Sequence, residues 1–158
     1  MAFLEWLQTT WVAELVATSL WGYPLFETIH SLGMAMMIGS LGLINLRVLG
    51  YKPELPLLGM RQLLPLAWLG FTLNAISGTL LFSSDAVYFF AKWTLRIKLI
   101  LVMLGGLNAA LLGRSVFREA AAGASAPPVA AGAKVIAFLS IVFWLGAVCF
   151  GRLIAYEQ

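Results

Sequence analysis

Long apolar runs separated by short polar segments dominate this sequence. Four of these runs, 24–46, 63–84, 93–113 and 135–156, are long enough to cross a bilayer. A helix needs about 20 mostly apolar residues to span the hydrocarbon core, and only helices and closed barrels can cross it. The pattern therefore predicts an all-α integral membrane protein, a single domain over residues 1–158 built as a four-helix bundle.

The segment before the first run, residues 1–22, differs from the four runs. It contains Trp6, Trp11 and Trp21 but no Lys or Arg. Tryptophan favours the headgroup level of a bilayer. We therefore expect residues 1–22 to form an interfacial amphipathic helix that lies on the membrane surface. Because basic residues are missing, the segment does not resemble a cleavable signal peptide.

Composition agrees with a membrane protein and excludes several function classes. The chain is 61% hydrophobic and 11% charged, whereas soluble domains carry roughly a quarter charged residues. The net charge of +3 does not indicate a nucleic-acid partner, and the lone Cys149 provides neither a disulfide framework nor a cysteine metal motif. Phosphate-binding loops, zinc-helix motifs and a Ser/His/Asp set are all missing, so the sequence favours a protein that is not an enzyme.

The basic residues outside the apolar runs indicate the orientation. They are Arg47, Lys52 and Arg61 after the first run, Arg114, Arg118 and Lys134 in the linker 114–134, and Lys92, which falls on the outer side and is the exception. The positive-inside rule places both of these segments in the cytoplasm. We therefore predict a bacterial inner-membrane protein with both termini in the periplasm and a flexible cytoplasmic linker at 114–134.

Ionisable side chains within the apolar runs are the main candidates for function. They are Glu27, His30, Lys98, Arg96 and Arg152, with Asp85 just past the second run. An ionisable group at membrane depth is costly unless it is paired or used. Counted from aromatic residues at the expected interface, Glu27, Lys98 and Arg152 lie roughly 6–7 Å inside the membrane.

Two interpretations of this common depth stay open. The first is a ligand-binding pocket in the periplasmic half of the bundle, with Glu27 and His30 facing the ligand and Lys98 and Arg152 as charge partners. The second is a structural ion-pair network, in which Glu27 contacts Lys98 or Arg152 and the cations extend toward the interface.

Two cofactor alternatives depend on His30. Glu27, His30, Met34 and Met37 share one stripe of the first helix, and imidazole with thioether ligands suits copper. Histidine also ligates haem iron, so haem b is a second alternative, with Lys98, Arg96 and Arg152 as propionate partners. A quinone bound through His30 is the related redox alternative.

Small residues recur at four-residue spacing in the apolar runs. The sets are Ser31, Ala35 and Gly39; Gly70, Asn74 and Gly78; and Gly105, Ala109 and Gly113. Small residues at this spacing allow helices to approach closely. They predict either close packing within the chain or contacts in a homo-oligomer or larger membrane complex.

The chain resembles a family of small bacterial inner-membrane proteins defined as a domain of unknown function. The matching stretches cover nearly the whole chain and are 20–24, 27–33, 46–50, 95–99 and 151–156. The resemblance implies four helices and supplies no activity. More loosely, His30 in a helix rich in small residues is similar to copper-resistance D-type membrane proteins. The combined prediction is an inner-membrane binding module or accessory subunit with a polar pocket.

Overall fold

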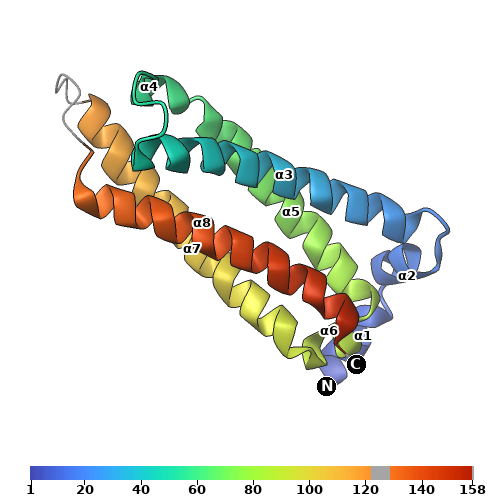
Figure 1. Cartoon of the computed structure of the whole chain (residues 1–158). Coiled ribbons are helices and arrows are strands. Elements are labelled where there is room, and N and C mark those ends of the chain that lie inside the picture. The colour runs from blue at the N-terminus through green and yellow to red at the C-terminus, as the bar shows by residue number, and fades with distance from the viewer. Residues whose placement is uncertain (122–128, 158) are drawn as a thin grey trace.

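The protein is a bundle of long helices, seen in a computed structural model that describes residues 1–121 and 129–157 (Figure 1). The long helices are α3 (Gly22–Leu49), α5 (Leu63–Ser84), α7 (Trp93–Ala121) and α8 (Ala131–Leu153), and the described residues contain no strand. The four candidate spans are long and apolar enough to cross a membrane. The all-α prediction and the four long helices are thus confirmed.

Shorter helices lie at the two ends of the bundle. The elements α1 (Ala2–Gln8), α2 (Trp11–Thr18), α6 (Ala86–Ala91) and the 3₁₀ helix η1 (Ile154–Tyr156) gather at the end that carries both termini (Figure 1). The opposite end carries α4 (Leu57–Met60).

The N-terminal segment contains two helices where one was expected over 1–22. The break lies at Thr9 and Thr10, and the Thr10 hydroxyl accepts a hydrogen bond of 3.4 Å from the Ala13 N–H to begin α2. An N-cap of this kind satisfies a free N–H of the new helix. Gln8 then donates a 2.8 Å hydrogen bond to the carboxylate of Asp85 and fixes α1 beside α6.

The third long helix was predicted to end at residue 113, but α7 continues to Ala121. The boundary had been placed where hydrophobicity falls, whereas alanine and arginine are strong helix formers whatever their hydrophobicity. The expected linker 114–134 is therefore helical at both ends, with Arg114 in α7 and Lys134 in α8. Residues 122–128 of that linker, and the side chain of Arg118, lie outside the described part.

The bundle consists of two helix pairs. Helix α3 packs along α5 and α7 packs along α8, while the pairs meet chiefly through α3 and α8. In the first pair the backbones touch at Gly33 and Gly70: a β-carbon on Gly33 would stand 2.8 Å from the Gly70 carbonyl oxygen. Glycine is required here because any side chain would separate the two helices.

The core is concentrated toward the α4 end. One buried cluster joins Ile44 and Val48 of α3 with Leu112 of α7 and Ala137 of α8. Asn45 of α3 also donates a buried 2.9 Å hydrogen bond to Ser140 of α8. Toward the termini α3 and α8 diverge (Figure 1). The two pairs are therefore joined at one end and separated at the other, which leaves space for a cavity.

Candidate functional site

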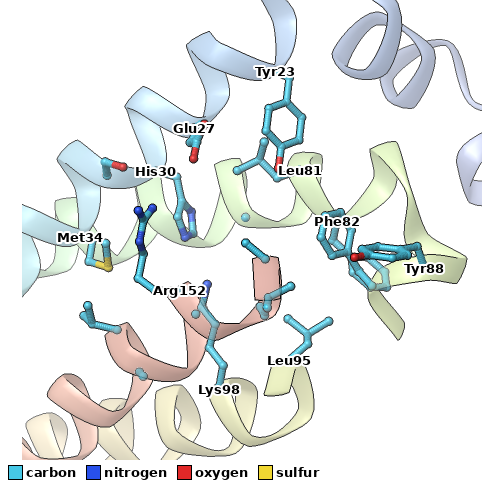
Figure 2. Close-up of a pocket in the computed structure, with 18 residues that line it drawn as sticks. Tyr23, Glu27, His30, Met34, Leu81, Phe82, Tyr88, Leu95, Lys98 and Arg152 are labelled. Carbon is cyan, nitrogen blue, oxygen red and sulfur yellow. The ribbon is translucent and has the colours of Figure 1, made fainter. Parts of the chain in front are cut away.

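A cavity of about 390 Å³ lies between the two helix pairs where they diverge (Figure 2). This volume is within the usual range of small-molecule sites, which is roughly 300–1,000 Å³. Four of the ionisable residues singled out in the sequence line it: Glu27, His30, Lys98 and Arg152. They come from α3, α7 and α8, so the fold brings together residues that lie far apart in the chain.

His30 is held against α5 by a reciprocal pair of hydrogen bonds. Its Nδ1 lies 3.0 Å from the backbone carbonyl oxygen of Asn74 and 3.1 Å from the Ser77 hydroxyl. The Asn74 side chain in turn donates a 2.9 Å bond to the His30 carbonyl oxygen. An edge of the ring contacts Gly78, where an added β-carbon would stand 3.0 Å from His30 Cε1 and 3.3 Å from Nδ1.

These contacts determine which ring nitrogen of His30 carries the proton. A backbone carbonyl only accepts hydrogen bonds, so the His30 Nδ1 must carry the proton that it shares with Asn74. In the neutral ring the other nitrogen, Nε2, is then an acceptor. Figure 2 shows the ring directed from α3 into the cavity, so this acceptor is available to a ligand.

Lys98 enters the cavity from α7 along the surface of α8. A β-carbon on Gly151 would lie 3.3 Å from the Cδ, Cε and Nζ atoms of Lys98. The half-buried ammonium group has no hydrogen bond or ion pair with any described residue. Such a cation at membrane depth has lost much of its hydration without gaining a partner.

Glu27 and Arg152 lie on facing helices at the edge of the cavity. Both are exposed, and their charged groups point into the space between α3 and α8 (Figure 2). The expected contact of Glu27 with Lys98 or Arg152 is not formed, since the ion pair between described residues is Lys52 with Glu54, far from the cavity. The cluster is therefore a set of separate charges around a space.

Aromatic and aliphatic side chains complete the cavity wall. Leu81 and Phe82 come from α5, Tyr88 and Phe89 from α6, and Leu95 from α7. Sequence reasoning had not predicted α6 or given these residues a role. The signal was the aromatic run at 88–90, which begins three residues after Asp85. The cavity thus combines a charged side with an apolar side.

Three predicted site residues lie outside the cavity. Asp85 accepts hydrogen bonds from the Gln8 side chain and the Tyr88 N–H, and so caps α6. Arg96 stacks over Phe90 and donates to its carbonyl oxygen. Both were expected to contact the ligand because of their sequence positions, but short local contacts determine where they point.

Met37 is the third predicted site residue outside the cavity. The predicted copper ligands His30, Met34 and Met37 therefore do not lie together. Met34 lines the cavity with His30, whereas Met37 is 3% exposed and packs with Trp144 in the core. The two helix pairs come closer together toward the C-terminal end of α3. Residues on one face of α3 therefore line the cavity near its start and lie in the core farther along. Among the described residues, no three His, Cys, Asp or Glu side chains are close enough to hold a metal ion.

Glu157, close to the C-terminus, ties the end of the chain to the start of α7. Its carboxylate accepts hydrogen bonds from the Trp93 and Thr94 N–H groups, at 3.1 and 3.2 Å, and from the Thr94 hydroxyl. Lys92 donates to the Glu157 carbonyl oxygen and lies 4.4 Å from the centre of the Tyr88 ring. This network holds α7, the C-terminus and a cavity-lining aromatic side chain together.

The same network changes the acidity of Glu157. Partial desolvation acts to raise the pKa of this carboxyl, but the hydrogen bonds from Thr94 and Trp93 and the charge of Lys92 outweigh it. The pKa of Glu157 is therefore lowered from its ordinary value.

Comparison of the chain with family models, with curated proteins and with solved structures finds no match in any of the three.

Proposed function

We propose that this protein is a membrane-embedded binding module that holds a small ligand in the cavity between its two helix pairs. The half-buried Lys98 ammonium carries the proposal, because it faces a cavity and has no partner among the described residues. Ionisable residues at membrane depth face a partner, a water-filled cavity or a substrate path. A ligand in the cavity would supply the missing partner.

The competing explanation is a structural ion-pair network. That explanation requires Glu27 to lie against Lys98 or Arg152, and no such pair is formed in the described part of the chain. The glycines beside the charged residues also favour a site. Gly78 and Gly151 leave room for His30 and Lys98 to pack closely against α5 and α8, and a binding site needs side chains held by such packing.

The proposed setting is the bacterial inner membrane, with both termini and the cavity on the periplasmic side. Arg47, Lys52 and Arg61 support this orientation because they lie at or near the α4 end, opposite the termini. A role as accessory subunit of a homo-oligomer or larger complex, and kinship with the bacterial family of unknown function, belong to the same proposal.

Native mass spectrometry of the full chain, purified in mild detergent, tests the binding function. We expect a bound species on the wild-type protein and its loss in Lys98→Met. The matched control is Lys134→Met, since Lys134 is exposed on α8 at the far end of the bundle. Identical spectra for all three proteins, with no bound species on any, would exclude a retained ligand and favour a structural role.

A redox cofactor held by His30, either haem b or a quinone, is the second candidate. The supporting observation is the bond from His30 Nδ1 to the Asn74 carbonyl, because ligating histidines usually donate their other ring N–H to such a group. A haem iron held by one histidine, as in globins, would need no second ligand from this chain. A Soret band in the wild type and not in His30→Ala would establish haem, and a colourless extract containing quinone would establish the quinone.

A further inference from the structure

The cavity opens sideways between α3 and α8. On these helices Glu27, Ser31 and Arg152 line the cavity and are also exposed. On α5 and α7 the lining residues, such as Phe82 and Lys98, are half-buried. Both α3 and α8 are candidate membrane spans, so in the proposed membrane setting an opening between them would face lipid. A ligand that enters this way must be soluble in the bilayer.

The charges around the opening favour an anionic head group. Lys98 lies inside and Arg152 at the edge, both without an ion pair among the described residues, while Glu27 is the one carboxylate in the lining. Charged groups that bind a phosphate or carboxylate make shorter and stronger hydrogen bonds than neutral groups. An anion between Lys98 and Arg152 would neutralise two unpaired cations at once.

His30 adds a requirement that separates one kind of anion from another. Its Nε2 is an acceptor in the neutral ring, because Nδ1 donates to Asn74. A head group that carries a hydrogen-bond donor beside its negative charge would satisfy this acceptor directly. A phosphate monoester does so in its singly protonated form, which is well populated since the second proton titrates at about pH 6.

The remaining wall accommodates an apolar chain. Phe82 and Tyr88 lie across the cavity from Arg152 (Figure 2), and Leu81 and Phe89 also line it. A head group among Lys98, Arg152 and His30 thus leaves its chain in contact with apolar side chains or acyl chains. Burial of each CH₂ group contributes roughly 0.8 kcal/mol.

We infer that the cavity binds a single-chain lipid with a phosphate-monoester head, taken laterally from the leaflet that surrounds this end of the bundle. This inference rests on the proposed binding function and specifies its ligand class. Lys98 and Arg152 hold the phosphate oxygens, and His30 accepts the hydroxyl proton of the head group. The ligand is a lipid, so the phosphate ion alone lacks the apolar contacts.

Calorimetric titration of the full chain, in nanodiscs of phosphatidylcholine at about pH 6.5, where neutral imidazole and singly protonated phosphate are both populated, tests the inference with matched probes. The probes are dodecyl phosphate, its methyl ester, dodecanol and inorganic phosphate. We expect dodecyl phosphate to bind at least about tenfold more tightly than dodecanol, with the methyl ester between them. A tenfold difference corresponds to about 1.4 kcal/mol, which is less than one charge-assisted hydrogen bond provides. Inorganic phosphate should compete weakly or not at all.

Two variants connect the preference to the residues. Lys98→Met and the exposed Arg152→Gln should each reduce the preference for dodecyl phosphate over dodecanol, whereas Lys134→Met should leave it unchanged. Arg152→Gln changes an exposed side chain and leaves the core intact, so its result does not depend on how the substitution of Lys98 affects folding.

Each contrary outcome has a distinct meaning. Equal binding of dodecanol and dodecyl phosphate would overturn the anionic head group while leaving the binding module intact. Equal binding of the methyl ester would overturn the role given to His30. Competition by inorganic phosphate at the same concentration would replace a lipid with the free ion. If no probe binds, the proposed ligand class is wrong. The proposed binding function is wrong as well only if the purified protein also carries no bound species.

Discussion

The Lys98 side chain lies flat along Gly151 of the neighbouring helix, so that a β-carbon at position 151 would stand 3.3 Å from three of its atoms. Helix α8 therefore does two things at this point. It presents Arg152 at the edge of the cavity, and the residue before it leaves room for the second cation. Both positive groups of the cavity depend on one turn of α8.

Gly151→Ala should weaken ligand binding while the protein stays folded. The added methyl group meets the flexible end of Lys98 at 3.3 Å, so the lysine side chain moves and the helices do not. The ammonium is then displaced from the position in which it meets the ligand. We expect a loss of affinity for dodecyl phosphate of about tenfold, equivalent to one displaced charge-assisted hydrogen bond.

Gly39→Ala is the matched control for this variant. It makes the same substitution in a long helix, and a β-carbon at Gly39 would have no neighbour within 4 Å. Binding should be unchanged, and stability should stay the same or rise by about 0.5–1 kcal/mol, because alanine loses less backbone entropy than glycine in a helix. Equal affinity of the Gly151 and Gly39 variants would show that the position of Lys98 does not matter for binding.

Lys98→Met should make the ligand-free protein more stable although it removes binding. Methionine has a similar length and no charge, so the half-buried ammonium without a described partner is replaced by a group that suits the apolar wall. We expect the free energy of unfolding to rise by about 0.5–2 kcal/mol, the usual effect of a stabilising substitution. Thermal unfolding in detergent without added ligand measures it. A lower midpoint would indicate that Lys98 stabilises the fold, as the structural explanation requires.

Gly33→Ala should destabilise the first helix pair. The added β-carbon would stand 2.8 Å from the Gly70 carbonyl oxygen and 2.9 Å from the Asn74 nitrogen, and these backbone atoms move only if the helices separate. Overpacking of this kind costs about 1–3 kcal/mol. A lower midpoint of thermal unfolding is expected, and Gly42→Ala serves as control because a β-carbon there would have no neighbour within 4 Å.

The sequence predicted the long helices because hydrophobicity is a local property. The run 63–84 was predicted with the bounds that α5 has. The end of α7 and the short α6 were missed, since neither depends on an apolar run long enough to span a membrane. Small residues predicted close packing correctly on α5, where Gly70 contacts α3. On α3 the contact uses Gly33, whereas Ser31, Ala35 and Gly39 of the predicted stripe are exposed.

The candidate site was partly predictable for the same reason. Glu27, His30, Lys98 and Arg152 stood out because charge within an apolar run is visible in the sequence. What the charges contact is a tertiary property. The sequence did not indicate that Glu27 would stay apart from the cations or that the helix pairs would diverge.

The predicted orientation is tested by cysteine labelling in intact cells. Cys149 is exposed, so Cys149→Ser provides the background for Glu5→Cys near the N-terminus and Glu54→Cys in the loop after α3. A maleimide reagent that does not cross the inner membrane should label position 5 directly and position 54 only after permeabilisation. The reverse pattern would place the cavity on the cytoplasmic side and contradict the positive-inside prediction.

Acid should destabilise the protein through Glu157. The pKa of this carboxyl is lowered in the folded protein, so its ionised form stabilises the fold. That contribution is complete above the unfolded-state pKa, taken as the ordinary value of 4.5, and is lost as pH falls below it through the lowered folded-state pKa. The midpoint of thermal unfolding should therefore fall on acidification below about pH 4.5.

Glu157→Gln removes the titrating group and should remove this part of the pH dependence, at the cost of a lower midpoint at neutral pH. The amide oxygen of glutamine accepts fewer of the bonds that Trp93 and Thr94 donate at the start of α7. Glu14→Gln, an exposed change on α2, should behave like the wild type. If the Glu157 variant instead follows the wild-type curve at every pH, the C-terminal network does not hold α7, and the fixed position of Tyr88 at the cavity end must have another cause.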